Sequence, residues 1–376
     1  MAEKRTDTHG AAAGGEIIFC HVNPMRGVSG GDVYNARLQS LASEMPDVEV
    51  HEYVLLPAHE RVASLRKKFL VPLMLPFRHP FRGGERGGRA WMFNSAKSLW
   101  FLPLALALRM RGERMAAVVH HPMHLQFGGL KGKIYETAEY AFLRLMDRIV
   151  VPSPYVAGLL EGRGLADRIS FLPIPFDSTG NRREETHGKE DVYEGGCRIV
   201  SIATLERRKG QMNLLRAMKM LKDSGFEISA TLVGKEVERT YAIELRRYAE
   251  TEGLDVTFAG YVESGEKQRI MEKGNVFVSA SQAEGYGMAV VEAMLAGLPV
   301  VAFRNTSMPM LLNRGERGVL CRDGDPGALA DGIRRVTEDR DLRRLVTGRA
   351  RAFAASLPDS GMFSRRWQEI VKKEIF

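Results

Sequence analysis

Short apolar runs alternate with amphipathic stretches over most of the chain. Residues 16–24 (EIIFCHVNP) form an apolar run that ends in a turn, and a glycine-rich loop separates it from a helical stretch at 32–45. In that stretch Val33, Leu38 and Leu41 can share one face. The alternation continues with strand-like runs at 116–122 and 147–155 and a helical pattern at 133–145. Such alternation predicts a parallel sheet covered by helices.

The same alternation resumes after a polar break. Residues 177–196 (DSTGNRREETHGKEDVYEGG) contain almost nothing to bury, so we place a domain boundary there. Beyond the break, strands are expected at 197–205, 228–234, 256–262, 275–281 and 298–303, and helices at 212–221 and 241–253. The sequence therefore predicts a second α/β domain.

The organisation expected from these patterns has five parts. They are a flexible tail (1–14), a first α/β domain (15–177), a polar linker (178–196), a second α/β domain (197–356) and a C-terminal helix (357–376). Trp367, Ile370 and Val371 group together on this last helix, so we expect it to pack back on the first domain.

Length and composition agree with two globular domains. The chain has 376 residues, of which 44% are hydrophobic and 27% charged, enough apolar mass for two cores. Its three cysteines, Cys20, Cys197 and Cys321, follow no metal-ligand or disulfide spacing. The first residues lack the apolar core of a secretory signal. We therefore expect a cytoplasmic protein.

The positive charge is concentrated in one stretch of the first domain. Residues 61–115 contain 12 Lys and Arg against two Glu, interleaved with Phe, Trp and Leu. Such a basic and aromatic insert favours an anionic membrane surface as a partner, on the inner face of the cell membrane. The alternative is a solvated basic face over core helices. The longest apolar run, 99–108, contains Pro103 and is too short to span a bilayer, which needs about 20 residues.

The segment 279–303 carries the most specific chemical signal. A strand runs into a glycine-bounded loop that holds Glu284, and an apolar helix follows in which Glu292 is the one charged residue. The helix is expected to be buried all round, so this carboxylate needs a partner. The partner is either a cap or a nearby Lys or Arg, or else the hydroxyls of a ligand. Gly285 and Gly287 allow the backbone to approach such a ligand closely, and the helix N-terminus supplies N–H donors.

This segment, EGYGMAVVEAMLAGLPVVA, closely resembles the Glu-x7-Glu signature of the retaining glycosyltransferases of family four. The resemblance covers residues 197–340 strongly and the first domain loosely. It implies the GT-B fold, α/β with two Rossmann-like parallel-sheet domains facing a central cleft. It also implies that Glu284 is catalytic and contacts the donor sugar, and that Glu292 binds the ribose hydroxyls. The donor-binding backbone would be that of Gly285, Tyr286, Gly287 and Met288.

A second segment resembles the part of that family which binds the donor phosphates. In SIATLERRKGQMNLL (201–215), Lys209 stands at the family's lysine and Thr204 at the usual arginine position. A lysine beside a glycine suits a diphosphate, because it is a mobile cation next to a flexible turn. Standing alone, it is equally a solvated charge. Either Arg207 or Arg208 supplies a second cation, or Lys209 serves by itself.

Two further stretches bear on the donor. VTFAGYV matches the family's segment near the nucleotide base and places Tyr261 and Val262 there. Residues 304–310 (RNTSMPM) depart from the pattern, which often has two glycines and a glutamate after PVVA. Because that part of the pattern lines the donor pocket, the donor's identity does not follow from the resemblance.

In the first domain, a glycine loop and a histidine are the candidates. GVSGG (27–31) occupies the place of the family's glycine loop, with Gly30 and Gly31 as donor-binding residues, and no clean GxGxxG motif follows the strand. His120 and His121 end a predicted strand, where parallel sheets place functional residues. By register, His120 matches the family's catalytic histidine better, and His121 is the alternative.

Taken with the resemblance, these patterns predict a hexosyltransferase that uses a nucleotide-sugar donor, a UDP- or GDP-sugar. The acceptor would be a glycan or a lipid-linked molecule in glycan or cell-envelope biosynthesis, and the configuration would be retained. We expect no metal, since no DxD-like motif lies in a suitable place, and we also expect no cofactor and no nucleic-acid partner. The alternatives are a sugar-nucleotide epimerase of GT-B-like fold and a non-catalytic protein that binds an anionic surface or nucleic acid.

Overall fold

The computed structural model describes residues 15–21, 30–54, 88–95, 98–176 and 196–376. The predicted tail (1–14), the larger part of the predicted linker (177–195) and residues 61–87 of the predicted insert lie outside these ranges. The chain divides into two compact units. Unit 1 consists of Met1–Pro173 and Met362–Phe376, and unit 2 of Ile174–Gly361.

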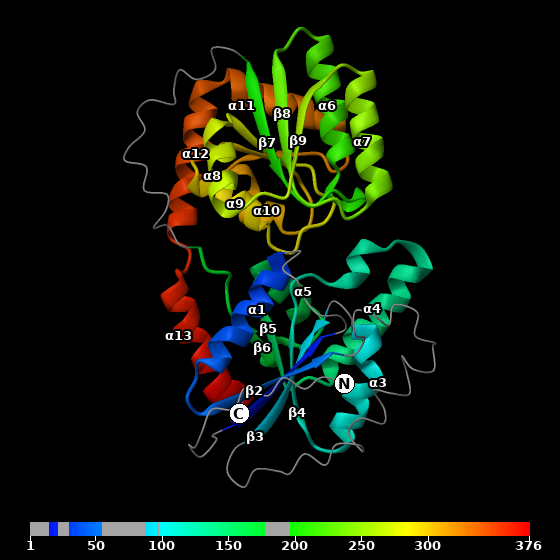
Figure 1. Ribbon diagram of the computed structural model, residues 1–376, viewed down its shortest axis with the longest axis vertical. Coiled ribbons are helices and arrows are strands. Elements are labelled where there is room, and N and C mark those ends of the chain that lie inside the picture. Colours follow the sequence, from blue (N-terminus) through cyan, green and yellow to red (C-terminus); the bar gives the residue numbers. More distant parts are fainter. Residues whose placement is uncertain (1–14, 22–29, 55–87, 96–97, 177–195) are drawn as a thin grey trace. The chain divides into compact units, whose positions relative to one another are not determined.

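Unit 1 is built on a six-stranded parallel sheet (Figure 1). The strand order is β2-β1-β3-β4-β5-β6, with β1 (Gly15–His21), β2 (Val48–Val54), β3 (Gly88–Asn94), β4 (Arg114–Val118), β5 (Arg148–Val151) and β6 (Ile169–Phe171). The helices are α1 (Gly30–Ser43), α3 (Ser98–Met110), α4 (Gly129–Arg144), α5 (Pro154–Glu161) and α13 (Ser360–Ile370). The predicted parallel α/β architecture is thus present in the first unit.

Two details of unit 1 differ from expectation. Val33 is 54% exposed, whereas Tyr34, Leu38 and Ala42 are buried. The buried face of α1 therefore follows the spacing Tyr34, Leu38 and Ala42, and of the three residues expected to share a face Leu38 lies on it. Residues 88–110, assigned to a basic insert, form β3 and α3 of the core instead.

Aromatic residues in that stretch pack in the interior. Phe93 and Phe101 are fully buried, and their ring centroids lie 5.3 Å apart. The Phe142 ring of α4 meets the Phe93 ring edge-on at 5.5 Å. Since offset and edge-to-face pairs of this kind stabilise protein interiors, the hydrophobicity of residues 88–110 is explained by the core. It supplies no argument for a lipid interface.

The C-terminal segment completes unit 1. Trp367 of α13 is fully buried, and its indole Nε1 donates a hydrogen bond to the carbonyl oxygen of Leu38 at 3.0 Å. The Phe363 ring packs edge-on against Tyr34 at 5.4 Å. A Cβ at Gly15 would overlap the ring of Phe376. Residues far apart in the sequence thus share one core.

Unit 2 repeats the design with a second six-stranded parallel sheet, in the order β12-β11-β10-β7-β8-β9. Its strands are β7 (Cys197–Ile202), β8 (Ile228–Val233), β9 (Asp255–Gly260), β10 (Val276–Ser279), β11 (Val300–Phe303) and β12 (Val319–Cys321). Its helices are α6 (Gln211–Asp223), α7 (Arg239–Thr251), α8 (Ser264–Lys273), α9 (Met288–Leu295), α10 (Met308–Leu311), α11 (Pro326–Glu338) and α12 (Arg340–Ala355). Helices α6 and α7 lie on one side of the strands, and α8 and α9 on the other (Figure 1).

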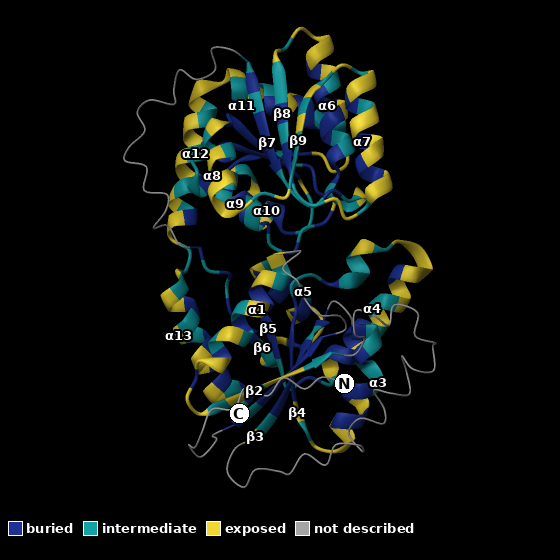
Figure 2. Cartoon of the chain, in the orientation of Figure 1, coloured by how far each residue is buried: buried dark blue, intermediate teal, exposed yellow. Residues whose placement is uncertain are grey.

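Burial follows this layering. Strands β10 and β11 are almost wholly buried and the edge strand β9 has no buried residue, while α7 exposes its outward face (Figure 2). Helix α9 is less enclosed than its apolar sequence predicts. Val290, Val291, Ala293 and Met294 are buried, whereas Glu292 is only half-buried. The expectation that this helix is buried all round is therefore wrong, because one side of it keeps contact with solvent.

Each sheet has a point at which the strand order reverses. In unit 1 this point lies between β1 and β3, and in unit 2 between β7 and β10. Ligands of open α/β sheets bind in the crevice outside the carboxyl ends of the strands at such points. Among the described residues, no helix has the length and apolarity that crossing a membrane requires.

Candidate active site

Two loops of unit 2 meet at its switch point. One follows β7 (203–210) and the other follows β10 (280–287). The Gln282 amide donates to the carbonyl oxygen of Arg208 at 2.9 Å, and Arg208 Nη1 donates to the carbonyl oxygen of Ala283 at 2.8 Å. These bonds hold the loops together at the carboxyl edge of the sheet.

Gly210 makes this close approach feasible. Its φ is +66°, and a Cβ there would overlap the carbonyl oxygen of Ala280. Only glycine combines a left-handed backbone with the absence of a side chain, so this position requires it. The residue just before it, Lys209, is thereby brought against the second loop.

Lys209 and Glu284 form an ion pair between these loops, Nζ to Oε1. Both side chains are mostly buried, at 12% and 19% exposure, and the Ser281 hydroxyl donates to the same carboxylate oxygen at 3.2 Å. Burial by itself would raise the pKa of Glu284, but Lys209, Arg208 and the Ser281 hydroxyl together lower it below its ordinary value. Glu284 is therefore ionised at neutral pH.

The two arginines beside Lys209 have different environments. Arg207 Nη2 donates to both carboxylate oxygens of Glu244 of α7, at 2.6 and 2.8 Å, and the guanidinium lies 5.2 Å from the Tyr241 ring centroid. Arg208 instead reaches into the loop pair and also contacts Glu206 at 2.7 Å. The second cation near Glu284 is thus Arg208, while Arg207 pairs with Glu244 on the surface of α7.

Thr204 belongs to the same network. Its hydroxyl donates to Glu206 Oε1 at 2.7 Å, the oxygen that also accepts from Arg208. Glu206 therefore orients Thr204 and Arg208 together. The position at which the resembled family has an arginine is occupied here by a hydroxyl group, and Arg208 brings a guanidinium into the same network.

The loop 285–288 leads into α9. Gly287 has a φ of +97°, and a Cβ there would lie 2.6 Å from Met308 Cε, so glycine is needed at the start of the helix. Met288 is the first helical residue, and Gly285 is buried. The Tyr286 ring stacks on Phe176 with centroids 6.0 Å apart, and burial raises the pKa of Tyr286 to about 12.

Glu292 projects from α9 toward α8. Its Oε1 lies 2.7 Å from Lys267 Nζ, and each side chain is 28% exposed. The carboxylate thus has a lysine partner, the first of the two alternatives left open by the sequence. A carboxylate has a second oxygen with further acceptor capacity, so this pairing is compatible with hydroxyl binding as well.

Tyr261 and Val262 follow β9, two strands from β7 at the edge of the sheet. Tyr261 is 63% exposed, and Lys235 Nζ lies 4.7 Å from its ring centroid. The two residues share the carboxyl edge with Lys209 but form a separate group on it. An exposed aromatic ring beside a lysine offers a stacking surface.

The candidates of unit 1 form a group of their own. Gly30 and Gly31 are the first two residues of α1, not part of a loop as predicted. A Cβ at Gly31 would lie 3.2 Å from the His120 ring, and His120 Nε2 lies 2.8 Å from Asn35 Oδ1. The Tyr34 ring packs edge-on against His120 at 5.0 Å. The start of α1 therefore holds this imidazole through three residues.

His120 is a neutral imidazole at physiological pH. Burial lowers its pKa to about 4. Because the Asn35 carboxamide oxygen can only accept, Nε2 carries the proton and Nδ1 keeps its lone pair. His121, the alternative candidate, is half-buried beside it.

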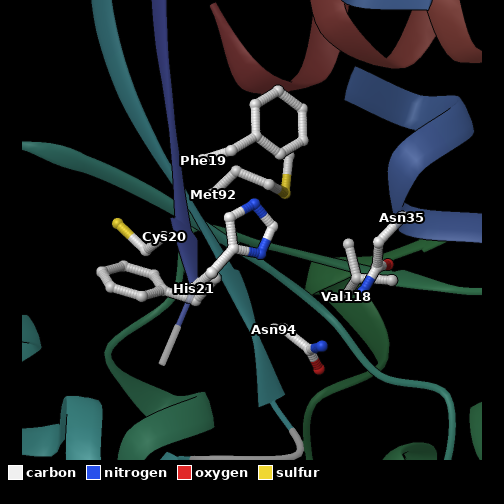
Figure 3. Close-up of a pocket in the computed structure, with 8 residues that line it drawn as sticks. Phe19, Cys20, His21, Asn35, Met92, Asn94 and Val118 are labelled. Carbon is white, nitrogen blue, oxygen red and sulfur yellow. The ribbon is translucent and has the colours of Figure 1, made fainter. Parts of the chain in front are cut away.

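A small pocket lies at the carboxyl ends of β1, β3 and β4 (Figure 3). Its polar members include His21, Asn35 and Asn94. His21 is 5% exposed, its Nε2 lies 3.5 Å from Glu52 Oε1, and burial lowers its pKa. Asn35 joins this pocket to His120. The sequence patterns did not single out His21 or Asn35, although a polar residue at the end of an apolar strand is a signal that would have found His21.

No group of three or more His, Cys, Asp or Glu in the described ranges is arranged to hold a metal ion. The unit 2 site instead brings two cationic side chains, Lys209 and Arg208, to the loop that carries Glu284. Cations in this position suit an anionic ligand.

Comparison with known proteins identifies the second part of the chain. Residues 182–353 match the family model of the glycosyl transferases group 1. The matched residues lie within unit 2, so the likeness to group 1 glycosyl transferases belongs to this part of the chain. Lys209, Glu284 and Glu292 all lie within it, as do the loops that hold them.

Curated relatives match this chain over part of their length. The chain is 33% identical over 102 residues to sulfoquinovosyl transferase SQD2 of Arabidopsis thaliana, which is 26% of this chain and 20% of that protein. It is 27% identical over 225 residues to the putative colanic acid biosynthesis glycosyltransferase WcaL of Salmonella typhimurium, 57% of this chain and 54% of that protein. The chain thus spans about half the length of one of these relatives and a fifth of the other.

Solved structures show that the fold extends beyond the group 1 domain. Sucrose-phosphate synthase from Thermosynechococcus elongatus has a TM-score of 0.71 at 19% identity, and the match covers 96% of this chain and 98% of that one. HepE of Anabaena, in complex with UDP and glucose, has a TM-score of 0.70 at 19% identity, with coverage of 95% and 99%. With two six-stranded parallel sheets, the chain has the predicted α/β GT-B fold.

Proposed function

We propose that this protein is a glycosyltransferase that moves a sugar from a nucleotide-sugar donor to a glycan or lipid-linked acceptor. The observation that carries the proposal is the ion pair of Lys209 and Glu284 at the switch point of a group 1 domain. A cation and an ionised carboxylate, held side by side in a ligand-binding crevice, can receive the two ends of a sugar diphosphate.

In this proposal, the cationic side chains that now pair with carboxylates pair with the donor diphosphate when the donor binds. Lys209 and Arg208 turn from carboxylates to the diphosphate, and the backbone at the start of α9 adds N–H donors and the positive end of the helix dipole. Glu284 then accepts hydrogen bonds from the sugar hydroxyls, and Glu292 from the ribose. HepE has been solved with UDP and with UDP-glucose, so UDP-sugars are the donors to test first, followed by GDP-sugars.

The chemical step requires stabilisation of the departing diphosphate. Preorganised cations and N–H dipoles can provide it where negative charge develops, and we assign this role to Lys209 and Arg208, without a metal ion. The spacing of Glu284 and Glu292 supports the finer assignment to the retaining family four. We propose His120, which is neutral at physiological pH, as a second catalytic residue. Its match to the catalytic histidine of the resembled family and its hydrogen bond to Asn35 support this role.

The acceptor belongs, in this proposal, to glycan or cell-envelope biosynthesis at the inner face of the membrane. WcaL is named for colanic acid biosynthesis and LpsE of Rhizobium meliloti for lipopolysaccharide core biosynthesis. The excess of Lys and Arg in residues 61–115 supports peripheral attachment to anionic lipid. Residues 61–87 of that stretch lie outside the described ranges. The proposed membrane attachment is therefore tested by binding of the protein to anionic liposomes at low salt.

The decisive experiment combines nucleotide binding with product analysis. UDP, GDP, ADP and their sugars are titrated by calorimetry in the presence of EDTA, and turnover is followed by nucleotide release with an acceptor extract. We expect one nucleotide to bind, and we expect Lys209→Met to reduce the affinity for that nucleotide at least tenfold. Arg207→Met is the matched control, because Arg207 is paired with Glu244 on the surface.

Three outcomes would overturn the proposal. Binding of no nucleotide favours a non-catalytic protein. Release of UDP together with an epimerised sugar, without acceptor, shows a sugar-nucleotide epimerase. Equal loss of affinity in the Lys209 and Arg207 variants contradicts the assigned donor site.

A further inference from the structure

The segment 304–310 contacts the loop that carries Glu284. The backbone amide of Glu284 donates a hydrogen bond to the Thr306 hydroxyl at 2.9 Å. Thr306 lies between β11 and α10, far from Glu284 in sequence. The residue whose carboxylate meets Lys209 is thus fixed at its backbone by a side chain from another element.

The Thr306 hydroxyl has a second partner. It donates to Asn305 Oδ1 at 3.1 Å, while Asn305 Nδ2 donates to the carbonyl oxygen of Ser281 at 3.0 Å and also to Asp323. The hydroxyl therefore accepts from one side and donates on the other. Because its donor and acceptor capacities are both used, its orientation is determined.

A third bond reaches the same loop. Ser307, which is 3% exposed, donates through its hydroxyl to the carbonyl oxygen of Tyr286 at 3.2 Å. Asn305, Thr306 and Ser307 thus contact the loop at Ser281, Glu284 and Tyr286 in turn. Three successive side chains match three successive points of the loop that carries the carboxylate.

The backbone at Thr306 is strained. Its φ is +43°, in the left-handed region that a β-branched residue rarely occupies. Glycine would adopt this backbone without strain, but it would have no hydroxyl to offer Glu284. Strained residues persist where the surrounding structure over-determines them, and such sites cluster around functional groups. The hydroxyl contacts supply that over-determination here.

We propose that Thr306 is a positioning residue for Glu284: its hydroxyl fixes the Glu284 backbone so that the carboxylate stays directed at Lys209. The consequence for catalysis rests on the proposed function, in which Glu284 contacts the donor sugar. The consequence for the rigidity of the loop 280–287 does not rest on the proposed function. Thr306 itself touches the Glu284 amide and not the carboxylate, so it acts through Glu284.

The test uses substitutions that separate hydroxyl from shape. Thr306→Val removes the hydroxyl and keeps the branched shape, and Thr306→Ser keeps the hydroxyl. Thr337→Val is the matched control, because the Thr337 hydroxyl of α11 also bonds a backbone group, the carbonyl oxygen of Ile333 at 2.8 Å. Hydrogen exchange of a peptide covering residues 280–287 is measured by mass spectrometry, together with kcat, KM and the Kd for UDP.

We expect Thr306→Val to speed exchange at the Glu284 amide about tenfold, the effect of one lost hydrogen bond. With a turnover assay in hand, kcat falls about tenfold while the Kd for UDP stays within about twofold, because Lys209 and Glu292 are intact. Thr306→Ser restores both exchange and kcat to within about threefold of the parent protein, and Thr337→Val leaves the 280–287 peptide unchanged.

Two results would overturn the inference. One is exchange of the 280–287 peptide at the parent rate in Thr306→Val. The other is faster exchange with an unchanged kcat. A parent protein without transferase activity would refute the proposed function, whereas the exchange measurement still decides whether Thr306 positions Glu284.

Discussion

Lys267 of α8 and Glu292 of α9 form an ion pair, with Nζ 2.7 Å from Oε1. The pair explains how a charged residue is accommodated in an otherwise apolar helix. It also holds the carboxylate in a fixed orientation before any ligand arrives. A partly exposed pair of this kind contributes little to stability, typically about 0–1 kcal/mol, so its presence alone does not account for Glu292.

The first prediction separates ligand binding from pairing at Glu292. Glu292→Gln is expected to weaken UDP binding about tenfold or more, because a neutral amide accepts a weaker hydrogen bond from ribose hydroxyls than a carboxylate does. Lys267→Met removes the partner and is expected to reduce UDP affinity by less than about threefold, with a stability loss below about 1 kcal/mol. Calorimetric titration and thermal unfolding measure the two effects. Equal UDP affinity in the parent protein and Glu292→Gln would restrict Glu292 to the ion pair.

The second prediction concerns the glycine that lets the two loops meet. Gly210→Ala combines a left-handed backbone with overlap against the Ala280 carbonyl oxygen, whereas at Gly225, with a φ of +81°, an added Cβ would have nothing within 4 Å. Gly225→Ala should cost about 1 kcal/mol from backbone strain alone. Gly210→Ala should cost at least about 2 kcal/mol more and abolish nucleotide binding, since the loops must separate. Scanning calorimetry that gave the same transition temperature for both variants would contradict this account of Gly210.

The third prediction is a pH dependence that arises from His120. Its pKa in the folded state is about 4, against 6.5 for an unperturbed histidine. Between these values the unfolded chain binds a proton that the native protein does not. The stability associated with neutral His120 is therefore complete above about pH 6.5 and is lost as the pH falls toward about 4. By about pH 5 the loss amounts to about 2 kcal/mol.

This loss is measurable by urea unfolding at pH 7.5 and pH 5, with His120→Asn as the reference. The three tryptophans of the chain, Trp91, Trp100 and Trp367, all belong to unit 1, so their fluorescence reports on the unit that contains His120. The parent protein should lose about 2 kcal/mol more than the variant between the two pH values. An identical pH dependence in both proteins would show that His120 titrates normally in the folded state.

The fourth prediction concerns the C-terminal segment. Trp367→Ala removes a fully buried indole and its hydrogen bond to Leu38, so unit 1 should lose about 3–5 kcal/mol of stability. Leu106→Ala, at a side chain 47% exposed on α3 of unit 1, serves as the control and should change stability by less than about 1 kcal/mol. The remaining tryptophans, Trp91 and Trp100, report the transition. A change of less than about 1 kcal/mol for Trp367→Ala would show that α13 is dispensable to the core.

Much of the fold was predictable because it depends on local patterns. Buried strands of parallel sheets are short apolar runs, and the runs around Ile149, Val200 and Val301 stand out as such. Strand β2 was missed because it lies at the edge of its sheet, where none of its residues is buried and polar residues interrupt its apolar positions. Strand β3 and helix α3 were missed because the surrounding basic residues concealed an apolar core segment.

The site was predictable in its residues more than in its contacts. The spacing of Glu284 and Glu292 singles out these two residues as candidates for the site, and their roles stay predictions. The partners come from other elements, and nothing in the local sequence indicates Lys267 for Glu292 or Thr306 for Glu284. The choice between Arg207 and Arg208 likewise depends on Glu244, which lies on α7. Long-range pairings of this kind are set by topology, which local periodicity does not encode.

The division of the chain has a consequence for the order in which the protein is made. Unit 2 is one continuous segment, whereas unit 1 needs residues 362–376, which are synthesised after the whole of unit 2. Until then the surface of α1 that receives Trp367 and Phe363 is uncovered. The nascent unit 1 therefore keeps an exposed apolar surface while unit 2, synthesised later, already has all of its own residues. Synthesis of unit 1 thus starts before that of unit 2 and is completed after it.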